Sequence, residues 1–346
     1  MKNRPIEVRR EDASCRLYTA NILLAIMGMV LAPLPVKSEV QVDPALPHYS
    51  SQAPLSGTVS AAGDDDMESL MNGWVAVFQK VHPAVAIRLD VDSTATAAKA
   101  LAAGAEIAFV GRKMLDPELA VVTAAWGYQP LPVTVAGGSY NDKDKTHAEF
   151  VWVNPENPIQ GMTLVQLDAI FGEQRRRGAP RAINTWGDLG LTGDWANKPV
   201  HAFRHRSVGV TQFINETVLQ GGTWRNSVKL LDKAKEVPPA IARDKYAIGL
   251  AGLGFANGLN VRALNIARSA DSSFVVPSLE NIASRQYPLS RVVYIYVNKA
   301  PGKPLNPLVM EFLNAVLSKE GQMAAMRDGF LPLSYDDAAA AMAQLN

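Results

Sequence analysis

Three short polar turns in this sequence have the residue types and positions needed to bind a small anion. They span residues 63–67, 92–96 and 204–211, and each follows a predicted strand and precedes a predicted helix. The first N–H groups of a helix have no partner within the helix and lie at the positive end of its dipole, so converging helix N-termini form an anion cradle. Hydroxyl groups at such turns usually cap the helix instead, so each turn alone is a weak signal.

The elements that would position these turns follow from the hydrophobic pattern of residues 57–110. Apolar residues at helical spacing predict a helix over residues 67–78, and alternation predicts a strand over residues 85–91. We expect further strands at residues 58–61 and 106–110 and an alanine-rich helix at residues 97–103. This β-α-β-α-β order indicates a parallel sheet with helices on its faces, and ligands of such sheets bind at the carboxyl ends of the strands.

The second half of the chain continues the alternation of strands and helices. A Thr-x-x-Gln capping box from Thr163 to Gln166 predicts where one helix begins. Residues 172–199 hold many Gly, Arg, Trp and Asn residues and indicate an irregular excursion. The remaining elements that we expect are strands at residues 150–153, 199–203 and 292–297 and helices near residues 213–218 and 308–317.

Composition excludes several classes of protein. The chain has 346 residues, of which 48% are hydrophobic and 19% charged, as in a globular protein with a large core. The net charge of +1 gives no basic field for nucleic acid. Cys15 is the single cysteine, which rules out an internal disulfide and a thiolate zinc cluster. We expect no cofactor, since the glycines between residues 249 and 258 do not fit a dinucleotide fingerprint.

The N-terminus has the pattern of a secretory signal. A basic region is followed by the apolar stretch NILLAIMGMVLAPLPV at residues 21–36, which is too short to span a bilayer comfortably. We predict a signal peptide over residues 1–38, whose removal leaves 28 basic and 30 acidic residues, a net charge of −2. Residues 39–56 are rich in Pro, Ser and Gln and predict a flexible linker.

Two other kinds of function compete with anion binding. A hydrolase would need a motif such as His-Glu-x-x-His or Gly-x-Ser-x-Gly, and the sequence has neither. A cation site could use Asp64, Asp65 and Asp66 together with Asp90 or Asp92, but EF-hand spacing is absent. Helix capping and a solvated acidic rim explain these aspartates more simply, so we expect neither an enzyme nor a metal site.

Several longer stretches resemble one known family. They are GMTLVQLDAIF at residues 161–171, TWGDLGLTGDWANKP at 185–199, DKYAIG at 244–249, YIYVNKAP at 294–301 and LSKEG at 317–321. The chain resembles the periplasmic phosphate-binding proteins of ABC transporters, in the type II periplasmic-binding-protein superfamily. The resemblance runs from about residue 57 to residue 332.

This resemblance implies an α/β fold of two lobes, each a mainly parallel sheet flanked by helices, with the ligand in the cleft between them. We expect lobe 1 to comprise residues 57–138 plus 269–346 and lobe 2 residues 139–268. The implied function is capture of a small oxyanion, above all phosphate, in the periplasm for an ABC permease in the inner membrane. Hinge closure over the ligand, without covalent chemistry, would be the mechanism. We expect a monomer.

The ligand residues that carry over come from the same three turns. Arg204 is the best anion contact by this comparison, followed by the hydroxyls of Ser93 and Thr94. Gly209 would let the backbone approach the ligand, and Asp65 would accept a ligand proton. Asp66 and Ser207 complete the predicted set.

The turns also depart from the family pattern. The first usually reads Gly-Ser-Asp-Thr-Met and here reads Gly-Asp-Asp-Asp-Met, while Val208 and Val210 replace a Ser and a Thr in the third. Lost hydroxyl donors and added carboxylates both disfavour a buried dianion. Three alternatives follow: weak phosphate binding, a different ligand, or no ligand and a role as an envelope sensor that acts through a protein partner.

Overall fold

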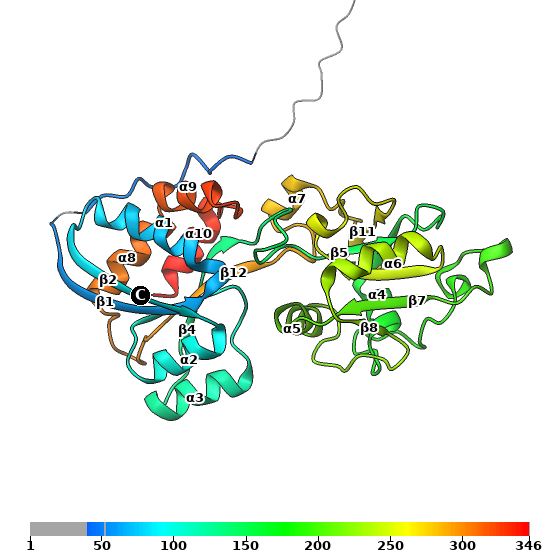
Figure 1. The fold of residues 1–346 in the computed structure, drawn as a ribbon, viewed down its shortest axis with the longest axis horizontal. Helices are drawn as coiled ribbons and strands as arrows, with labels where there is room; N and C mark the ends of the chain where they lie inside the picture. Colours follow the sequence, from blue (N-terminus) through cyan, green and yellow to red (C-terminus); the bar gives the residue numbers. More distant parts are fainter. Residues whose placement is uncertain (1–39, 52, 346) are drawn as a thin grey trace, which may run out of the picture. The chain divides into compact units, whose positions relative to one another are not determined.

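The computed structural model describes residues 40–51 and 53–345, and these contain two α/β lobes (Figure 1). The predicted signal peptide over residues 1–38 lies outside the described residues. None of the helices within the described ranges has the length and apolarity needed to cross a membrane.

The first lobe is built on a five-stranded mixed sheet with the order β2-β1-β3-β12-β4. Strands β1, β2 and β3 are parallel, as the opening β-α-β-α-β pattern predicts, whereas β12 runs antiparallel to both of its neighbours. The five strands are β1 (Ser56–Asp64), β2 (Ala84–Asp92), β3 (Ile107–Val110), β4 (Leu131–Gly137) and β12 (Val292–Val297).

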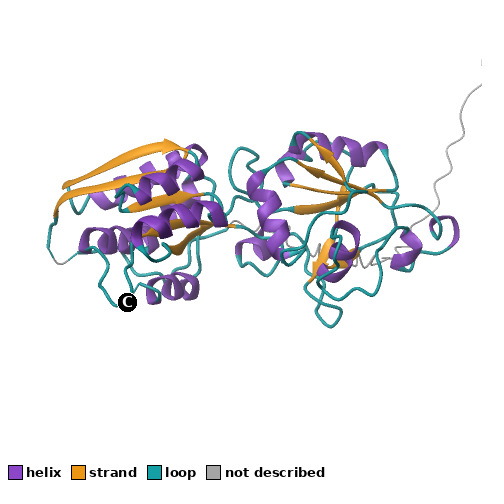
Figure 2. Cartoon of the chain, turned by 90° about the horizontal axis from the view of Figure 1, so that it is seen from below, coloured by secondary structure: helices purple, strands orange, loops and turns teal. Residues whose placement is uncertain are grey.

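Helices cover both faces of this sheet (Figure 2). One face packs against large side chains such as Trp74, Phe78 and Phe312, which come from α1 (Glu68–Gln79) and α8 (Pro307–Leu317). The helices α9 (Lys319–Arg327) and α10 (Tyr335–Ala343) join them on that face. The opposite face packs against the smaller side chains of α2 (Thr94–Ala102) and α3 (Asp116–Trp126).

The second lobe has a sheet with the order β10-β5-β9-β7-β8 and a two-stranded parallel sheet of β11 and β6. Its strands are β5 (Phe150–Val153), β6 (Gly161–Thr163), β7 (His201–His205), β8 (Lys229–Leu231), β9 (Ala247–Ala251), β10 (Arg262–Ala263) and β11 (Asn265–Ala267). Its helices are α4 (Leu164–Phe171), α5 (Val208–Thr217), α6 (Val237–Arg243) and α7 (Leu279–Ala283).

The predicted capping box and irregular excursion are both confirmed in this lobe. Thr163 Oγ1 accepts the N–H of Gln166 at 3.1 Å, and the Gln166 side chain accepts the N–H of Thr163 at 2.9 Å. Within residues 172–199 the only regular segments are the short 3₁₀ turns Trp186–Leu189 and Gly193–Trp195.

Two crossover segments join the lobes and lie side by side. The first leads from β4 to β5 and the second leads back to β12. The N–H of Gly138 donates to the carbonyl of Arg291 at 2.7 Å, and the N–H of Glu149 donates to the carbonyl of Leu289 at 3.0 Å. Ile282, Tyr287 and Leu289 pack into the core of the second lobe, so this core continues about twenty residues beyond the expected boundary at residue 268.

The described residues before β1 differ from the expected flexible linker. Leu46 is buried in the first-lobe core. The carbonyl of Pro47 accepts the N–H of Lys319 at 2.9 Å, and His48 contacts Glu320 at 2.7 Å. The apolar side chain of Leu46 and these polar contacts hold the segment against the lobe.

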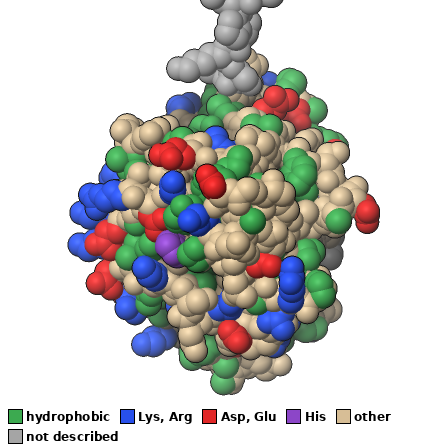
Figure 3. All heavy atoms as spheres, turned by 90° about the vertical axis from the view of Figure 1, so that its right-hand side faces the viewer, with side chains coloured by type: hydrophobic (Ala, Val, Ile, Leu, Met, Phe, Trp, Pro, Cys, Tyr) green, Lys and Arg blue, Asp and Glu red, His purple; other side chains and the backbone are tan. Residues whose placement is uncertain are grey.

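Basic and acidic side chains are interspersed on the face that Figure 3 presents. Neither sign forms a continuous field there, in keeping with the near-zero net charge of the whole chain.

Candidate functional site

A cleft of about 590 Å³ lies where strands of both sheets end. Asp64–Asp66 follow β1, Ser93 and Thr94 follow β2, and Ser207 and Gly209 follow β7. Residues of the two crossovers, among them Lys145, His147 and Arg291, complete the lining. Of the seven predicted ligand residues, six therefore come together: Ser93, Thr94, Asp65, Asp66, Ser207 and Gly209.

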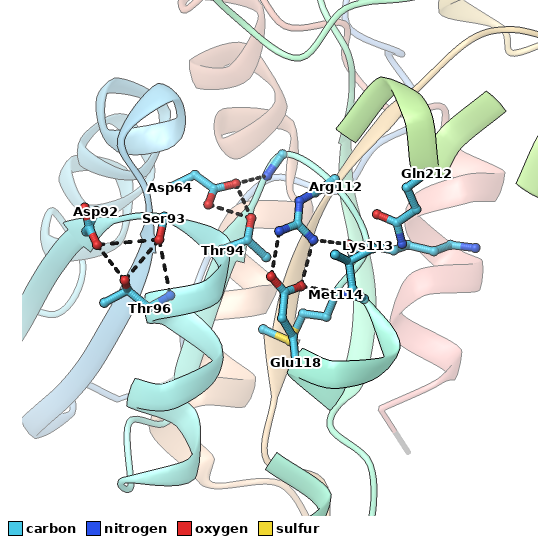
Figure 4. Close-up of polar contacts among 12 residues, drawn as sticks. Asp64, Asp92, Ser93, Thr94, Thr96, Arg112, Lys113, Met114, Glu118 and Gln212 are labelled. Carbon is cyan, nitrogen blue, oxygen red and sulfur yellow. Dashed lines mark hydrogen bonds and ion pairs between the residues drawn. The ribbon is translucent and has the colours of Figure 1, made fainter. Parts of the chain in front are cut away.

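Asp64 holds three segments of the first lobe together (Figure 4). Its carboxylate accepts the hydroxyl of Thr94 at 2.6 and 2.7 Å and the N–H of Gly111 at 2.9 Å. It does not cap a helix through its side chain. Burial raises the pKa of Asp64, and the bond from Thr94 opposes that rise. The single hydroxyl proton of Thr94 is thus committed to Asp64, although this hydroxyl was predicted to bind the ligand.

Asp65 and Asp66 differ in exposure. Asp65 is exposed, and its Oδ1 accepts the N–H of Asp66 at 2.9 Å. Asp66 is partly buried, and its Oδ1 atom has no hydrogen-bond partner among the described residues. Burial, followed by the charges of Asp64 and Asp65, raises the pKa of Asp66 to about 6, against the opposing effects of Arg291 and Lys145. Asp66 is therefore mostly ionised at pH 7 and neutral at pH 5.

Ser93 caps α2 and directs the N-terminus of this helix towards the cleft. Its Oγ accepts the N–H of Thr96 at 3.3 Å and lies 3.0 Å from Thr96 Oγ1, while Thr96 Oγ1 donates to Asp92 at 2.5 Å. Since the Thr96 proton goes to Asp92, the Ser93 hydroxyl has Thr96 Oγ1 at 3.0 Å and Asp92 Oδ2 at 3.5 Å as acceptors. The hydroxyl of Ser93 is already used within the protein (Figure 4).

Ser207 caps α5 in the same way from the second lobe. Its Oγ accepts the N–H of Val210 at 3.3 Å. Its hydroxyl proton makes no hydrogen bond to any residue that the structure describes, in contrast to Ser93. A β-carbon placed on Gly209 would lie 3.1 Å from Arg291 Nη2, so glycine leaves room here for that guanidinium.

Arg204 differs from the expectation, because it does not line this cleft. Its guanidinium stacks on Trp224, with Cζ 4.7 Å from the ring centroid, in a separate cavity of about 800 Å³. Successive side chains of a strand point to opposite faces, and at the end of β7 it is the neighbouring His205 that lines the cleft.

Arg291 and the polar residues of the first crossover were not predicted from the sequence. Arg291 is only 9% exposed and lies in the loop before β12, where no turn-and-helix pattern marks it. Lys145, His147 and Glu149 lie on a segment without regular structure, so periodicity could not have found them either. What places them at the cleft is the pairing of the two crossovers.

Four of the cations that line the cleft are paired with carboxylates. Arg112 forms two bonds of 2.7 Å to Glu118 (Figure 4). The other three ion pairs are Lys145 with Asp328 at 2.9 Å, Lys143 with Asp144 at 2.7 Å and Arg206 with Asp232 at 3.5 Å. Within residues 40–51 and 53–345, six Lys or Arg and six Asp residues line the cleft, so the lining carries no excess of either charge.

Two histidines of the cleft are neutral at pH 7. Burial lowers the pKa of His147 and of His205 to about 4. Both are more than nine-tenths buried, and neither Nε2 atom has a hydrogen-bond partner within the described part of the chain. No group of three or more His, Cys, Asp or Glu residues in that part is arranged to hold a metal ion.

Comparison with known proteins agrees with this architecture. Residues 49–320 match the family model described as a PBP superfamily domain. The phosphate-binding protein PstS of Pseudomonas aeruginosa is 37% identical over 326 residues, which cover 93% of this chain and 98% of that protein. Protein SphX of Synechococcus elongatus is 26% identical over 323 residues, 92% of this chain and 86% of that protein.

Solved structures share the fold at lower identity. PstS from Borrelia burgdorferi has a TM-score of 0.57 at 18% identity and covers 81% of this chain and 100% of that structure. An ABC-type phosphate transport receptor from Vibrio cholerae has a TM-score of 0.53 at 16% identity, over 79% of this chain and 99% of that structure. With its fold, its cleft at the strand ends and its 37% identity over nearly the whole chain, this protein belongs to the PBP superfamily and is a homologue of the PstS phosphate-binding proteins.

Proposed function

We propose that this protein is a non-enzymatic solute-binding protein that captures a small oxyanion, phosphate first, in the cleft between its lobes. The PstS relatives that cover nearly the whole chain support this assignment. The ligand would pass to an ABC-type permease, and export through an N-terminal signal would place the protein in the periplasm.

The observation that carries the proposal is the meeting of two helix N-termini at one cleft. Helix α2 comes from the first lobe and α5 from the second, and serines cap both. Helices of nine and ten residues each present unpaired N–H groups and a positive dipole end to the same space. An oxyanion placed there would accept bonds from both lobes, which is what closure over a ligand requires.

The predicted residues keep distinct roles in this proposal. Ser207 would donate its hydroxyl proton to the ligand, and Gly209 would let the backbone of α5 come close to the ligand. Ser93 and Thr94 act through the N-terminus of α2, because their hydroxyl protons are used within the protein. Asp65 is exposed and keeps one carboxylate oxygen for a ligand proton, and Asp66 faces the ligand as an ionisable neighbour.

A second function competes because the cleft has so many carboxylates. Six aspartates among the described lining residues offset the six cations, and Arg204 lies in another cavity. A protein that has lost its anion and acts through a protein partner would tolerate this arrangement. The two functions differ in whether the cleft binds phosphate at all.

Isothermal titration of the purified protein with phosphate at pH 7, with sulfate as the control anion, separates them. We expect saturable binding of one phosphate per chain and a rise in the unfolding temperature with phosphate concentration. Absence of both heat and thermal shift would contradict oxyanion capture and favour the partner-binding function.

A further inference from the structure

We propose that Arg291, on the second crossover, is the guanidinium that binds the anion in the cleft, in the role that the family resemblance assigns to Arg204. This inference rests on the proposed capture of an oxyanion. It names the cation of that site and places it on the segment that joins the lobes.

Arg291 is buried without a counter-charge in contact among the described residues. Its side chain makes one hydrogen bond among the described residues, from Nη2 to the carbonyl of Gly111 at 3.5 Å, and no ion pair within 4.0 Å. Arginine is almost never buried without a partner. Since the residue also lines the cleft, the remaining donors of its planar fork are available to an anion there.

The fold makes room for the side chain of Arg291 and fixes its position. The carbonyl of Arg291 accepts the N–H of Gly138 at 2.7 Å, so the backbone is held by the first crossover. Its guanidinium lies 5.6 Å from the ring centroid of Phe213 on α5. Gly209 on the same helix has no β-carbon to crowd Nη2. Arg291 therefore contacts Gly111 of the first lobe and the N-terminal half of α5 from the second.

Glu149, an acid of the first crossover, does not neutralise Arg291. Glu149 is fully buried, and its Oε1 atom lies 3.5 Å from Nε2 of the neutral His147 without forming a hydrogen bond. Burial raises the pKa of Glu149 to about 8, so it is mostly protonated at pH 7. The other titratable or charged groups around Arg291 and Glu149 are Asp66, Arg112, His147, His205, Tyr287 and Tyr294. Asp66 is the one ionised acid of this group at pH 7.

Phosphate titrations of the wild type, R291Q, R204Q and R243Q at pH 7 test the assignment. Arg243 is an exposed arginine at the end of α6 and serves as the matched control for loss of one charge. We expect R291Q to weaken binding on the order of 10- to 100-fold, the range for a lost charge-assisted bond. R243Q should change phosphate affinity by less than about twofold, as expected for a distant exposed charge. A large loss in R204Q with none in R291Q would overturn the assignment, while a wild type that binds no phosphate would overturn the proposed function itself.

A second pair of variants keeps the assignment testable if R291Q does not fold. E149Q retains the shape of the protonated acid, and E156Q is the control because Glu156 is exposed on the same stretch of chain. As the pH rises from 7 to 9, Glu149 ionises and would offset the charge of Arg291. Phosphate affinity should therefore fall several-fold more over this range in the wild type and in E156Q than in E149Q, which cannot ionise. Comparison at equal pH cancels the titration of phosphate itself. Identical pH profiles for all three proteins would overturn the role of Arg291.

Discussion

The two lobes present the same device to the cleft, a serine-capped helix N-terminus, but they use their polar groups differently. In the first lobe, Thr94 donates to Asp64 and Thr96 to Asp92, while Ser93 bonds within the same turn to Thr96 and Asp92. In the second lobe, the hydroxyl proton of Ser207 has no partner within the described ranges, and Gly209 lies beside Arg291. The hydroxyl protons of the first-lobe turns are thus used within the protein, and we propose that ligand recognition is concentrated on α5 and the crossover.

The largest effect on stability should come from breaking the first-lobe network. T94V removes the donor to a partly buried carboxylate, and a bond to a charged group contributes about 2 kcal/mol. We expect the free energy of unfolding to fall by about that amount, measured by urea denaturation. Phosphate affinity should stay within about threefold, since the Thr94 hydroxyl donates to Asp64. A tenfold loss of affinity with unchanged stability would show that the two lobes share recognition after all.

The paired variants S207A and S93A compare the two caps directly. Each removes a helix cap and should cost about 1 kcal/mol of stability. Because only Ser207 has an uncommitted hydroxyl proton, S207A should also weaken phosphate binding roughly tenfold, and S93A about twofold or less. Equal losses of affinity in the two variants, measured by titration at pH 7, would remove the difference between the lobes.

Replacement of Asp66 in the first lobe should have a smaller effect on phosphate affinity, and this effect should depend on pH. Its pKa is raised to about 6, so the carboxylate is charged at pH 7 and neutral at pH 5. D66N removes the charge near the anion and should tighten phosphate binding a few-fold at pH 7 while matching the wild type at pH 5. The ratio of the two dissociation constants at each pH is the quantity to measure. A ratio that does not change with pH would mean that Asp66 does not face the ligand.

The smallest effect concerns the separate cavity of Arg204. W224F weakens a cation–π contact worth about 0.5–1 kcal/mol and should lower stability by a comparable amount. Phosphate affinity should not change, because this pair lies outside the cleft. A clear loss of affinity in W224F would instead connect Arg204 with the ligand site.

Much of the fold could be predicted because its signals are local. Residues 150–153 and 292–297 form strands as expected, and the Thr163 capping box marks the start of α4. The antiparallel insertion of β12 between β3 and β4 could not be predicted, because it brings back a segment about 180 residues later in the sequence. The burial of Leu46 could not be predicted either. A single apolar residue in a polar segment shows no hydrophobic periodicity, so nothing indicates that the segment packs against the first lobe.

The positions of the predicted ligand residues could be foreseen to a similar extent. Six of the seven expected residues share the cleft because strand-turn-helix patterns mark their turns. Arg204 shows where the pattern stops, since a motif places a residue at a strand end but does not determine on which face its side chain lies. Arg291 and Glu149 were missed because tertiary pairing of two irregular crossovers creates their environment.

The most direct test is a crystal structure of the protein with phosphate bound. We expect phosphate at the N-terminus of α5 in the cleft, bonded to the guanidinium of Arg291, with Arg204 still stacked on Trp224. Phosphate held by Arg204, or a cleft that stays empty at saturating phosphate while the anion binds elsewhere, would contradict this expectation.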